Sequence, residues 1–502
     1  MAEAEDLYNA MLERAKALPY YETAWPPKRD RRMQPVGLLP HRIELMGGHA
    51  STIGRHAAGA APLADARLEA LLRGWLALKA SEGSDTERPL YESMDVVELV
   101  QRLLVQRPLV FFKSHDEYAL RTGETGAGGA ALDLENGTLG GFALVGTDAE
   151  EAPLTLANTL SYDEMALSAL LSVANPTVFI NNGDRGNQAT PGRPGSFEPE
   201  GVYTGAVGAR FEACEQMEWR HMVVTFEQNT VAKGYGAQAD PAATQTKLLK
   251  LWADFYEVGS FSSFDEVEAE VEAAAETLGG ECRYVPLSIV RHGNISKAKY
   301  FDKMVYKKRL AAVLAPWLLD SNRRAADAGT TAFCVTTGLG LGAWGIDKCQ
   351  RLLMREVYAE LLTNLPLPSV SDFVGATPQE LGATNGEWLG TNNGSSSAGT
   401  NPTPRTLSLR ITRLTPGAAP VRIQPAKSGG GAWRNPATKL SGADQGKLLC
   451  AMYAWDGGAY PGNEFYEPYG SEPAFFSTPP CKIYRALIHT MYLTRRETPL
   501  QC

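Results

Sequence analysis

Apolar residues recur along this chain at helical spacing in some segments and as short continuous runs in others. Spacings of three and four residues are typical of helices that bury one face, whereas short apolar runs are typical of buried strands. The predicted helices cover residues 7–18, 66–79, 161–173, 244–258, 263–278, 299–326 and 346–365. The predicted strands cover residues 108–113, 177–180, 284–290, 332–335, 369–374, 407–414 and 448–455. Because strands alternate with helices after about residue 150, the pattern predicts an α/β layered sheet.

Two changes in this pattern divide the chain. Residues 1–150 are predicted to form a mostly helical accessory region, and residues 151–502 the main α/β domain. Within that domain, residues 380–404 are rich in Gly, Asn, Ser and Thr, which predicts a mobile insertion. Two of the predicted helices open on a Ser-x-x-Glu capping box, at Ser161 and Ser263.

Composition narrows the class of protein. The chain has 502 residues, of which 44% are hydrophobic, as expected for a globular protein with a large core. Its formal net charge of −9, without a long basic stripe, argues against a nucleic-acid partner. The seven cysteines are scattered and form no Cys-x-x-Cys pair, which favours reduced thiols in the cytosol over a disulfide framework.

The sequence shows no targeting segment of the usual kinds. The N-terminus reads Met-Ala-Glu-Ala-Glu-Asp and lacks the apolar stretch of a secretory signal. No uninterrupted apolar run approaches the ~18 residues of a membrane span. The basic run at residues 28–32 is interpreted as a solvated loop, although a weak nuclear signal is an alternative. We therefore expect a soluble cytoplasmic protein with no membrane partner, and a nuclear location stays open.

The most informative motif is the run from Thr336 to Gly345, which reads Thr-Thr-Gly-Leu-Gly-Leu-Gly-Ala-Trp-Gly. A predicted strand precedes it and a predicted helix follows, so backbone N–H groups are left beside a helix N-terminus. Such a loop binds phosphate because its donors point outward and the helix dipole favours negative charge. Glycine lets a ligand approach the backbone, and the Trp344 indole suits a wall over it. The predicted ligand-binding residues here are Gly338, Gly340, Leu341, Gly342, Ala343, Trp344 and Gly345.

A second polar segment follows the predicted strand at 177–180. Asn181 and Asn182 come directly after it, and Asp184 follows them. A loop rich in glycine then carries Glu200 and continues to Glu212. In open α/β sheets ligands bind at the carboxyl ends of strands. Amides there suit ribose hydroxyls, and carboxylates suit a cationic or reacting centre.

A third segment repeats this composition after the predicted strand at 448–455. It contains Asp456, two glycines, and then Asn463 and Glu464. One such loop would be unremarkable. Three of them, each at a predicted strand end, indicate a shared cleft.

Competing chemistries find little support in the sequence. There is no Gly-x-Ser-x-Gly elbow and no His-Glu-x-x-His. His41, His49 and His56 fit no zinc motif, so no metal is predicted. The spacing Gly340-x-Gly342-x-x-Gly345 matches the Rossmann dinucleotide fingerprint superficially, which keeps an NAD-dependent oxidoreductase as an alternative.

Taken together, these segments resemble a macrodomain of the ADP-ribosyl hydrolase type. The likeness is greatest to the divergent macrodomain family that includes the bacterial effector MavL and its eukaryotic relatives. The residues that carry it are 181–185, 205–212, 337–344, 455–456 and 461–464, within a resemblance spanning about 155–490.

The similarity to poly(ADP-ribose) glycohydrolase is more distant. Three consecutive glycines of that enzyme are reduced to Glu200-Gly201-Val202 here, and its Gln-Glu pair is replaced by Arg210-Phe211. On this comparison Glu212 stands in the place of the second, catalytic glutamate.

The resemblance implies a macrodomain-like three-layer α/β/α fold with a mixed central sheet, joined to the N-terminal accessory region. The implied activity is hydrolysis of the N-glycosidic bond between ADP-ribose and an arginine side chain. The partner would be an ADP-ribosylated protein, with ubiquitin as one candidate. ADP-ribose would be ligand and product, with no cofactor and no metal.

The resemblance also implies roles for the acids. Asp184 and Glu212 would be the principal catalytic carboxylates, because carboxylates stabilise an oxocarbenium-like transition state and can activate water. Glu200 and Asp456 would hold arginine or ribose, and the amides at 181 and 182 would position ribose hydroxyls. A module that binds ADP-ribose without cleaving a bond remains the main alternative.

Overall fold

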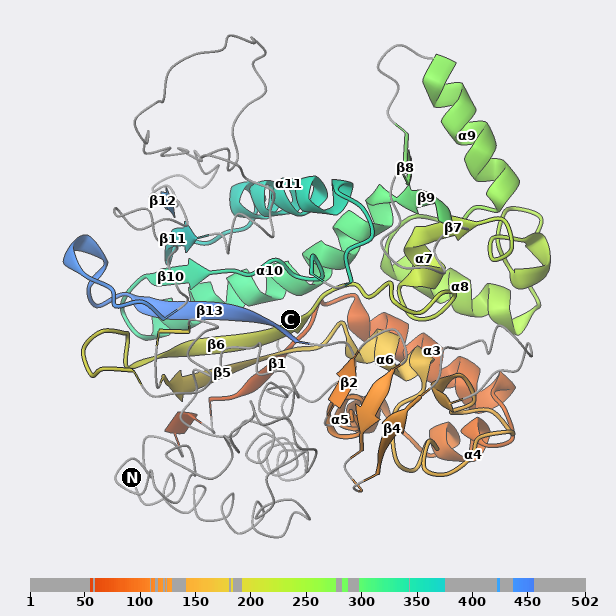
Figure 1. The fold of residues 1–502 in the computed structure, drawn as a ribbon, viewed down its shortest axis with the longest axis horizontal. Coiled ribbons are helices and arrows are strands. Elements are labelled where there is room, and N and C mark those ends of the chain that lie inside the picture. Colours follow the sequence, from red (N-terminus) through yellow and green to blue (C-terminus); the bar gives the residue numbers. More distant parts are fainter. Residues whose placement is uncertain are drawn as a thin grey trace.

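A mixed sheet of seven strands runs through the chain, in the spatial order β1-β5-β6-β13-β10-β11-β12 (Figure 1). The computed structural model describes residues 55–56, 59–108, 110–112, 116–120, 122, 124–128, 141–179, 182–183, 192–276, 282–287, 298–342, 344–374, 422–424 and 437–455. The seven strands are β1 (Ala61–Leu63), β5 (Ser172–Val178), β6 (Glu200–Val207), β13 (Leu448–Trp455), β10 (Ala332–Val335), β11 (Val370–Val374) and β12 (Arg422–Gln424). β6, β13, β10, β11 and β12 are parallel, whereas β5 is antiparallel to both β6 and β1.

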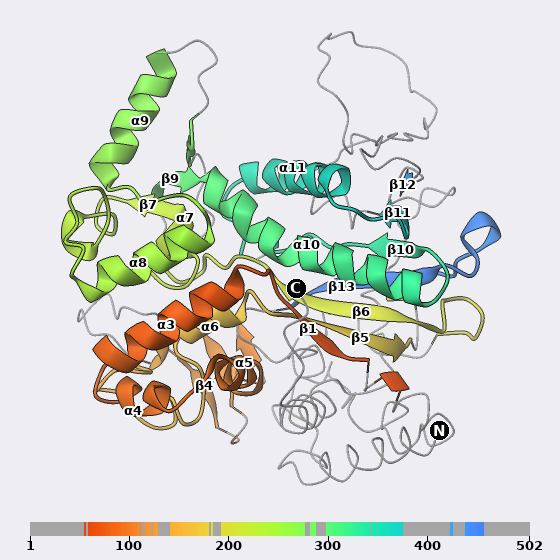
Figure 2. The same ribbon diagram turned by 180° about the vertical axis from the view of Figure 1, so that it is seen from behind.

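The long helix α10 (Lys303–Asp327) crosses one face of this sheet, in front of the strands in Figure 2. It contacts β1, β5, β6, β10 and β11, and it also packs on α11 (Cys349–Asn364). The helix begins where the Asp302 carboxylate accepts hydrogen bonds from the amides of Met304 and Val305, at 3.1 and 3.0 Å. Among its buried side chains, Leu314 and Trp317 have no exposed surface. Much of this face of the sheet is therefore covered by one continuous helix.

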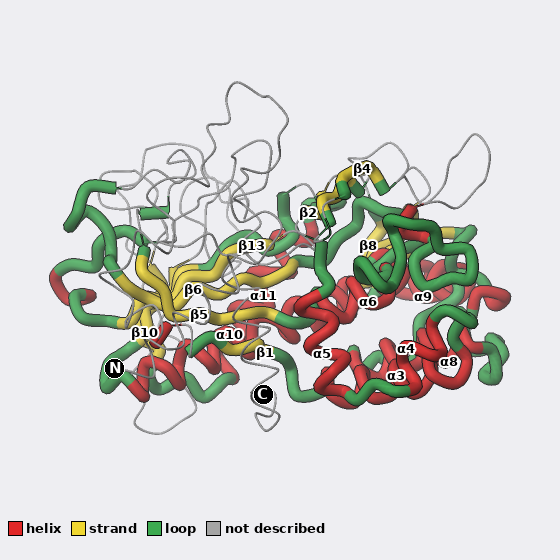
Figure 3. The backbone as a smooth tube through the Cα atoms, turned by 90° about the horizontal axis from the view of Figure 1, so that it is seen from below, coloured by secondary structure: helices red, strands yellow, loops and turns green. Residues whose placement is uncertain are grey.

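A second group of elements lies beyond one end of the sheet strands, where α3, α4 and α8 gather in Figure 3. Its helices are α3 (Leu68–Glu82), α4 (Glu87–Glu92), α5 (Val96–Val105), α6 (Tyr162–Ser168), α7 (Trp219–Met222), α8 (Thr244–Phe255) and α9 (Phe264–Glu276). Two small sheets have the orders β2-β3-β4 and β7-β9-β8. Their strands are β2 (Val110–Phe112), β3 (Glu117–Ala119), β4 (Thr125–Ala127), β7 (Val223–Thr225), β9 (Ala298–Asp302) and β8 (Tyr284–Pro286). Short 3-10 turns are Gly141–Ala143, Val231–Lys233 and Gly442–Asp444.

One hydrophobic cluster joins the two groups. It includes Leu63 of β1 and Trp75 of α3, and it continues through the central sheet to Trp455 of β13. Part of the region before residue 150 therefore shares its core with the sheet. The predicted division into two domains near residue 150 stays a prediction.

Several predicted elements are confirmed within a few residues. They are the helices α3, α8, α9 and α10 and the strands β2, β8, β10, β11 and β13. Both predicted capping boxes form: the Ser161 hydroxyl accepts from the Glu164 amide at 3.2 Å, and the Ser263 hydroxyl accepts from the Glu266 amide at 3.4 Å. The predictions for residues 7–18, 380–404 and 407–414 lie outside the described residues.

Other predictions were wrong. The segment at 200–207, interpreted as part of a glycine-rich loop, is strand β6 in the interior of the sheet. The helix opened by Ser161 ends at Ser168 rather than near 173, and the next strand already begins at Ser172. Residues 299–302, expected at the start of the long helix, belong to β9. Among the described residues, no helix is long and apolar enough to cross a membrane.

Candidate functional site

The direction of the strands decides which predicted segments meet. β6, β13 and β10 are neighbours and run parallel, so the chain leaves Val207, Trp455 and Val335 at the same edge of the sheet. β5 is antiparallel to β6, with Val178 opposite Glu200, and it therefore ends at the other edge, as its arrowhead shows in Figure 1. The strands before the glycine loop and before the Asp456 segment thus end at one edge of the sheet, and the strand before Asn181 ends at the other.

The segment after β6 and the glycine loop after β10 touch through their backbones. A Cβ atom placed on Gly208 would lie 2.3 Å from the Gly340 nitrogen. Gly340 has a φ of +71°, and a Cβ atom there would lie 3.0 Å from the Ala209 carbonyl oxygen. Glycine is needed at both positions, because a side chain would push the two segments apart. This approach places the glycine loop beside the segment that carries Glu212.

The glycine loop retains amides that can bind a ligand. The amides of Leu339, Leu341 and Gly345 donate to carbonyls of the loop itself. Across the described part of the chain, the amides of Gly340 and Gly342 donate to no acceptor. Gly342 is exposed, and a Cβ atom on it would meet nothing within 4 Å. Unused backbone donors in a glycine-rich turn form a concave site for an anion.

The helix after this loop begins later than the sequence predicted. α11 starts at Cys349 rather than at 346. The Gln350 side-chain oxygen accepts from the Ile346 amide at 2.7 Å, and an Asp347 carboxylate oxygen accepts from the Cys349 amide at 2.7 Å. Because side chains already occupy these donors, anion binding would rest on the glycine amides more than on the helix N-terminus.

Four predicted residues of the loop are buried. Leu341 and Trp344 are 4% and 8% exposed and belong to the main hydrophobic cluster, and Gly345 is also buried. Gly338 is buried as well. The role of Trp344 as a wall over a ligand stays a prediction, with a small part of its surface accessible.

The carboxylate of Glu212 lies in a buried ion pair with Arg210. Its side chain is 6% exposed. Nε and Nη2 of Arg210 donate to the same oxygen of Glu212, Oε2, at 3.2 and 3.1 Å. Among the described residues, no donor reaches the other oxygen, Oε1. One oxygen of the predicted catalytic carboxylate is therefore fixed and the second is unused.

Arg210 is itself held from three sides. Its Nη2 also donates to Oδ1 of Asp116, whose side chain is 1% exposed. The guanidinium carbon lies 4.5 Å from the centroid of the Phe111 ring. Burial alone would lower the pKa of Arg210, but the carboxylates of Asp116 and Glu212 outweigh it, so the pKa is raised and the guanidinium stays charged.

Further buried polar contacts hold the residues around the Arg210 guanidinium in place. The Tyr162 hydroxyl donates to Oδ2 of Asp116. Burial, reinforced by the Asp116 charge, holds the pKa of Tyr162 well above its usual value, so the hydroxyl keeps its proton. Nearby, Glu218 accepts from Arg309 of α10 at 2.8 Å, and Arg309 also donates to the Val207 carbonyl at 3.1 Å. The end of β6 is thus tied to α10.

Two predicted residues lie at the opposite edge of the sheet. Glu200 is the first residue of β6, its side chain is 58% exposed, and it lies 3.5 Å from Nε2 of His56. Asn182 follows β5, and its carbonyl oxygen accepts from the Ala437 amide at 2.9 Å. At about 3.3 Å per residue, the eight-residue strand β6 separates Glu200 from the Glu212 side of the sheet by roughly 20 Å or more.

The remaining predicted site residues are outside the described part of the chain. They are Asn181, Asp184, Ala343, Asp456, Asn463 and Glu464. Their roles stay predictions.

Sequence reasoning missed the residues that hold Glu212. Arg210 lies within the segment 205–212 but was given no role. Phe111 and Asp116 lie before residue 150, where no catalytic or binding residue was predicted. No local signal identifies Asp116, because its partner Arg210 is 94 residues away in the sequence. Its φ of +48°, unusual for a residue other than glycine, becomes visible only in the structure.

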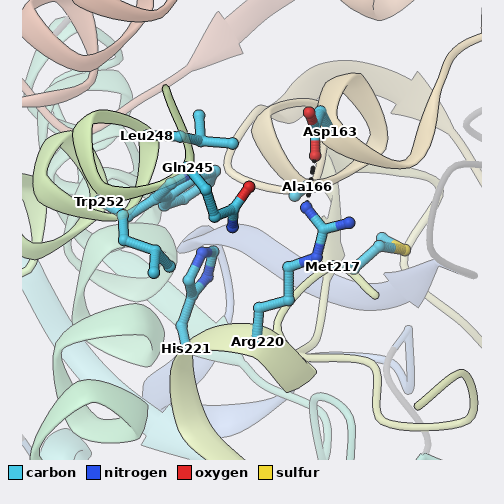
Figure 4. Close-up of a pocket in the computed structure, with 9 residues that line it drawn as sticks. Asp163, Ala166, Met217, Arg220, His221, Gln245, Leu248 and Trp252 are labelled. Atoms are coloured by element: carbon cyan, nitrogen blue, oxygen red, sulfur yellow. Dashed lines mark hydrogen bonds and ion pairs between the residues drawn. The ribbon is translucent and has the colours of Figure 1, made fainter. Parts of the chain in front are cut away.

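A separate small pocket lies between α6, α7 and α8 (Figure 4). Its polar lining includes Asp163, Arg220, His221 and Gln245, and none of the predicted site residues lines it. Nη1 of Arg220 donates to Asp163 at 2.8 Å. Burial lowers the pKa of His221 to about 3, assisted by the charge of Arg220, so the imidazole is neutral. Within the described ranges, no three His, Cys, Asp or Glu side chains are grouped to hold a metal ion.

Comparison with known proteins gives consistent matches. The family model described as "ADP-ribosylhydrolase MavL-like" matches residues 42–373 and 430–478. The Drosophila melanogaster protein named ADP-ribosylarginine hydrolase CG2909 is 32% identical over 451 residues, which cover 88% of this chain and 78% of that protein. The Drosophila melanogaster protein named ADP-ribosylarginine hydrolase CG3568 is 32% identical over 420 residues, covering 82% of this chain and 70% of that protein.

Proposed function

This chain belongs to the MavL-like ADP-ribosylhydrolase family, and from that premise we propose that it removes ADP-ribose from arginine side chains of modified proteins. Both matched fly proteins are named for that activity. The proposal includes the finer fold assignment, a macrodomain-like arrangement around the mixed sheet. Arginine-ADP-ribosylated ubiquitin is the first substrate to test, because the family resemblance includes it.

The observation that carries the proposed site is the contact between the two glycine-bearing segments. The approach of Gly208 to Gly340 brings the segment that carries Glu212 into contact with the loop that has unused amides. A diphosphate needs such donors, and a glycosidic bond being broken needs a carboxylate nearby. The two requirements of an ADP-ribose hydrolase are thereby supplied by neighbouring segments.

Glu212 is assigned the role of a carboxylate beside the bond that breaks. As the bond from the anomeric carbon to the arginine nitrogen lengthens, positive charge develops on the ribose, and the carboxylate stabilises it. Water adds to the anomeric carbon, its proton passes to a base, and the guanidine nitrogen leaves as the electron pair of the broken bond returns to it. Water is the only co-substrate, so we propose that no cofactor or metal takes part.

We propose a site that is smaller than the predicted one. Glu212 serves as a reacting carboxylate, and Gly340 and Gly342 bind the diphosphate. Asp184 and Asp456 remain candidates for the second carboxylate. Glu200 and Asn182 are left out of the site, because they begin at the other edge of the sheet.

The test is release of free ADP-ribose from arginine-ADP-ribosylated protein. We expect the full chain to release it, to leave glutamate-ADP-ribosylated protein unchanged, and to lose at least about 100-fold in kcat on Glu212→Gln, with the affinity for ADP-ribose retained. A wild-type chain that binds ADP-ribose but releases none would make it a binding module instead. A fully active Glu212→Gln variant would show that Glu212 is not the reacting carboxylate, while the proposed hydrolase activity would remain supported.

A further inference from the structure

The ion pair between Arg210 and Glu212 is asymmetric, and its asymmetry bears on the reaction. Both contacts from the guanidinium go to Oε2, at 3.2 Å from Nε and 3.1 Å from Nη2. A pair built for stability alone would engage both carboxylate oxygens, because the parallel two-bond geometry is the stronger one. Here one oxygen is restrained while the other keeps its lone pairs.

Arg210 can impose this restraint because it cannot move. Its side chain is 1% exposed, Asp116 accepts from the same Nη2, and Phe111 covers the guanidinium at 4.5 Å. Tyr162 in turn donates to the second oxygen of Asp116. Asp116 thus holds Arg210, and Tyr162 of α6 holds Asp116.

We propose that Arg210 is a positioning residue, which fixes Oε2 of Glu212 so that Oε1 is presented to water or to the reacting ribose, and that Asp116 and Tyr162 serve by holding Arg210. The inference rests on the proposed function of Glu212. It also gives the region before residue 150 a part in the reaction, since Phe111 and Asp116 belong to the β2–β3 hairpin and its turn.

The test compares Arg210→Met with Arg210→Lys. Methionine keeps much of the volume but removes the charge, whereas lysine keeps a charge without the planar fork. We expect Arg210→Met to lower kcat about 100-fold, with KM and the affinity for ADP-ribose changed less than threefold, because misplacing a reacting group acts on the chemical step. Arg210→Lys should restore only part of kcat, because its ammonium keeps the charge but cannot hold Asp116 and Glu212 through one planar group.

Tyr162→Phe and Arg324→Met complete the design. Tyr162→Phe removes one hydroxyl from the far end of the network, so it keeps the fold and should lower kcat about threefold to tenfold. Arg324→Met removes another ion pair, in which Arg324 donates to Asp320 at 2.6 Å in the last turns of α10, away from the Arg210 network. It should leave kcat unchanged and so controls for lost stability.

Three outcomes separate the inference from the proposed function. A normal kcat in folded Arg210→Met, or in Tyr162→Phe where Arg210→Met does not fold, would overturn the inference while Glu212→Gln is inactive. A fall in kcat no larger than that of the control variant, or no recovery of kcat in Arg210→Lys, would also overturn it. No release of ADP-ribose by the wild type would overturn the proposed function itself.

Discussion

The most perturbed histidine of the described chain shows how one side chain responds to its neighbours. His221 is 5% exposed, and its ring stacks on Phe261 with centroids 5.3 Å apart and lies 4.5 Å from the ring of Trp252. An imidazolium here would lose water and face the charge of Arg220. These effects lower its pKa to about 3. The neutral ring behaves as an aromatic core residue with a polar edge toward the pocket in Figure 4.

His221 should make the fold sensitive to acid. The unfolded chain takes up a proton at His221 below pH 6.5, whereas the folded chain does so only near pH 3. Its contribution to stability is therefore complete above pH 6.5 and is lost, at about 1.4 kcal/mol per pH unit, as the pH falls toward 3. Phenylalanine at this position keeps the aromatic contacts and cannot take up a proton.

We expect the free energy of unfolding of His221→Phe to fall by about 2 kcal/mol less than that of the wild type between pH 7 and pH 5. Urea unfolding at the two pH values measures the difference. Equal losses in the two proteins would show that His221 is protonated in the folded state at pH 5, contrary to this account.

At the scale of elements, the sequence predicted the helix starts and strands that are determined by residues close together in the chain. The capping boxes at Ser161 and Ser263 and the apolar runs of β10 and β13 are confirmed. The strand β6 was missed because its glycines were interpreted as loop residues. Gly205 instead makes room for Trp455, since a Cβ atom there would lie 1.5 Å from the indole ring. Glycine inside a strand can mark close packing as well as a turn.

In the candidate site, too, features determined by nearby residues could be predicted, and features that depend on distant residues could not. The sequence placed the glycine loop and Glu212 in one cleft, and the structure brings their segments into contact. The sequence could not show that β5 runs antiparallel to β6, because strand direction depends on pairing partners far apart in the chain. It also could not show that Asp116 reaches Arg210 across 94 residues.

The two loop glycines Gly340 and Gly342 should respond differently to the same substitution. Gly340→Ala forces a left-handed backbone, φ +71°, on a residue whose Cβ would lie 3.0 Å from the Ala209 carbonyl oxygen. This should cost about 1–2 kcal/mol of stability and weaken ADP-ribose binding at least tenfold. Gly342→Ala meets no atom within 4 Å and should leave stability unchanged.

Thermal unfolding and calorimetric titration with ADP-ribose measure the two effects. If Gly342→Ala were the more destabilising variant, the described geometry of the loop would be wrong. If Gly340→Ala bound ADP-ribose as tightly as the wild type, the loop would not be the diphosphate site.

At the scale of the whole molecule, the early part of the chain is built into the core. β1 pairs with β5, α3 packs on α8, and α10 contacts β1. Leu72, Trp75 and Leu99 have no exposed surface. Burial of each such side chain contributes about 1.5–3 kcal/mol, so losing these three alone would remove about 4.5–9 kcal/mol, comparable to the roughly 5–15 kcal/mol that stabilises a typical domain.

A chain that begins at residue 151 should therefore fail to fold. We expect it to lack a cooperative thermal transition, by circular dichroism, and to release no ADP-ribose. A chain that begins at residue 42, where the family match begins, is the control and should unfold cooperatively. A cooperatively folded, active 151–502 fragment would instead support an independent domain after residue 150.

The position of β13 has a consequence for biosynthesis. This strand stands between β6 and β10, although residues 448–455 are made about 240 residues after β6 and more than 100 after β10. On the ribosome, β6 and β10 must wait with unpaired backbone edges until the strand that separates them emerges. Exposed edges of this kind invite pairing with other chains. The nascent polypeptide should thus depend on chaperones late in translation, and premature stop codons before residue 448 should yield insoluble product rather than a partly active enzyme.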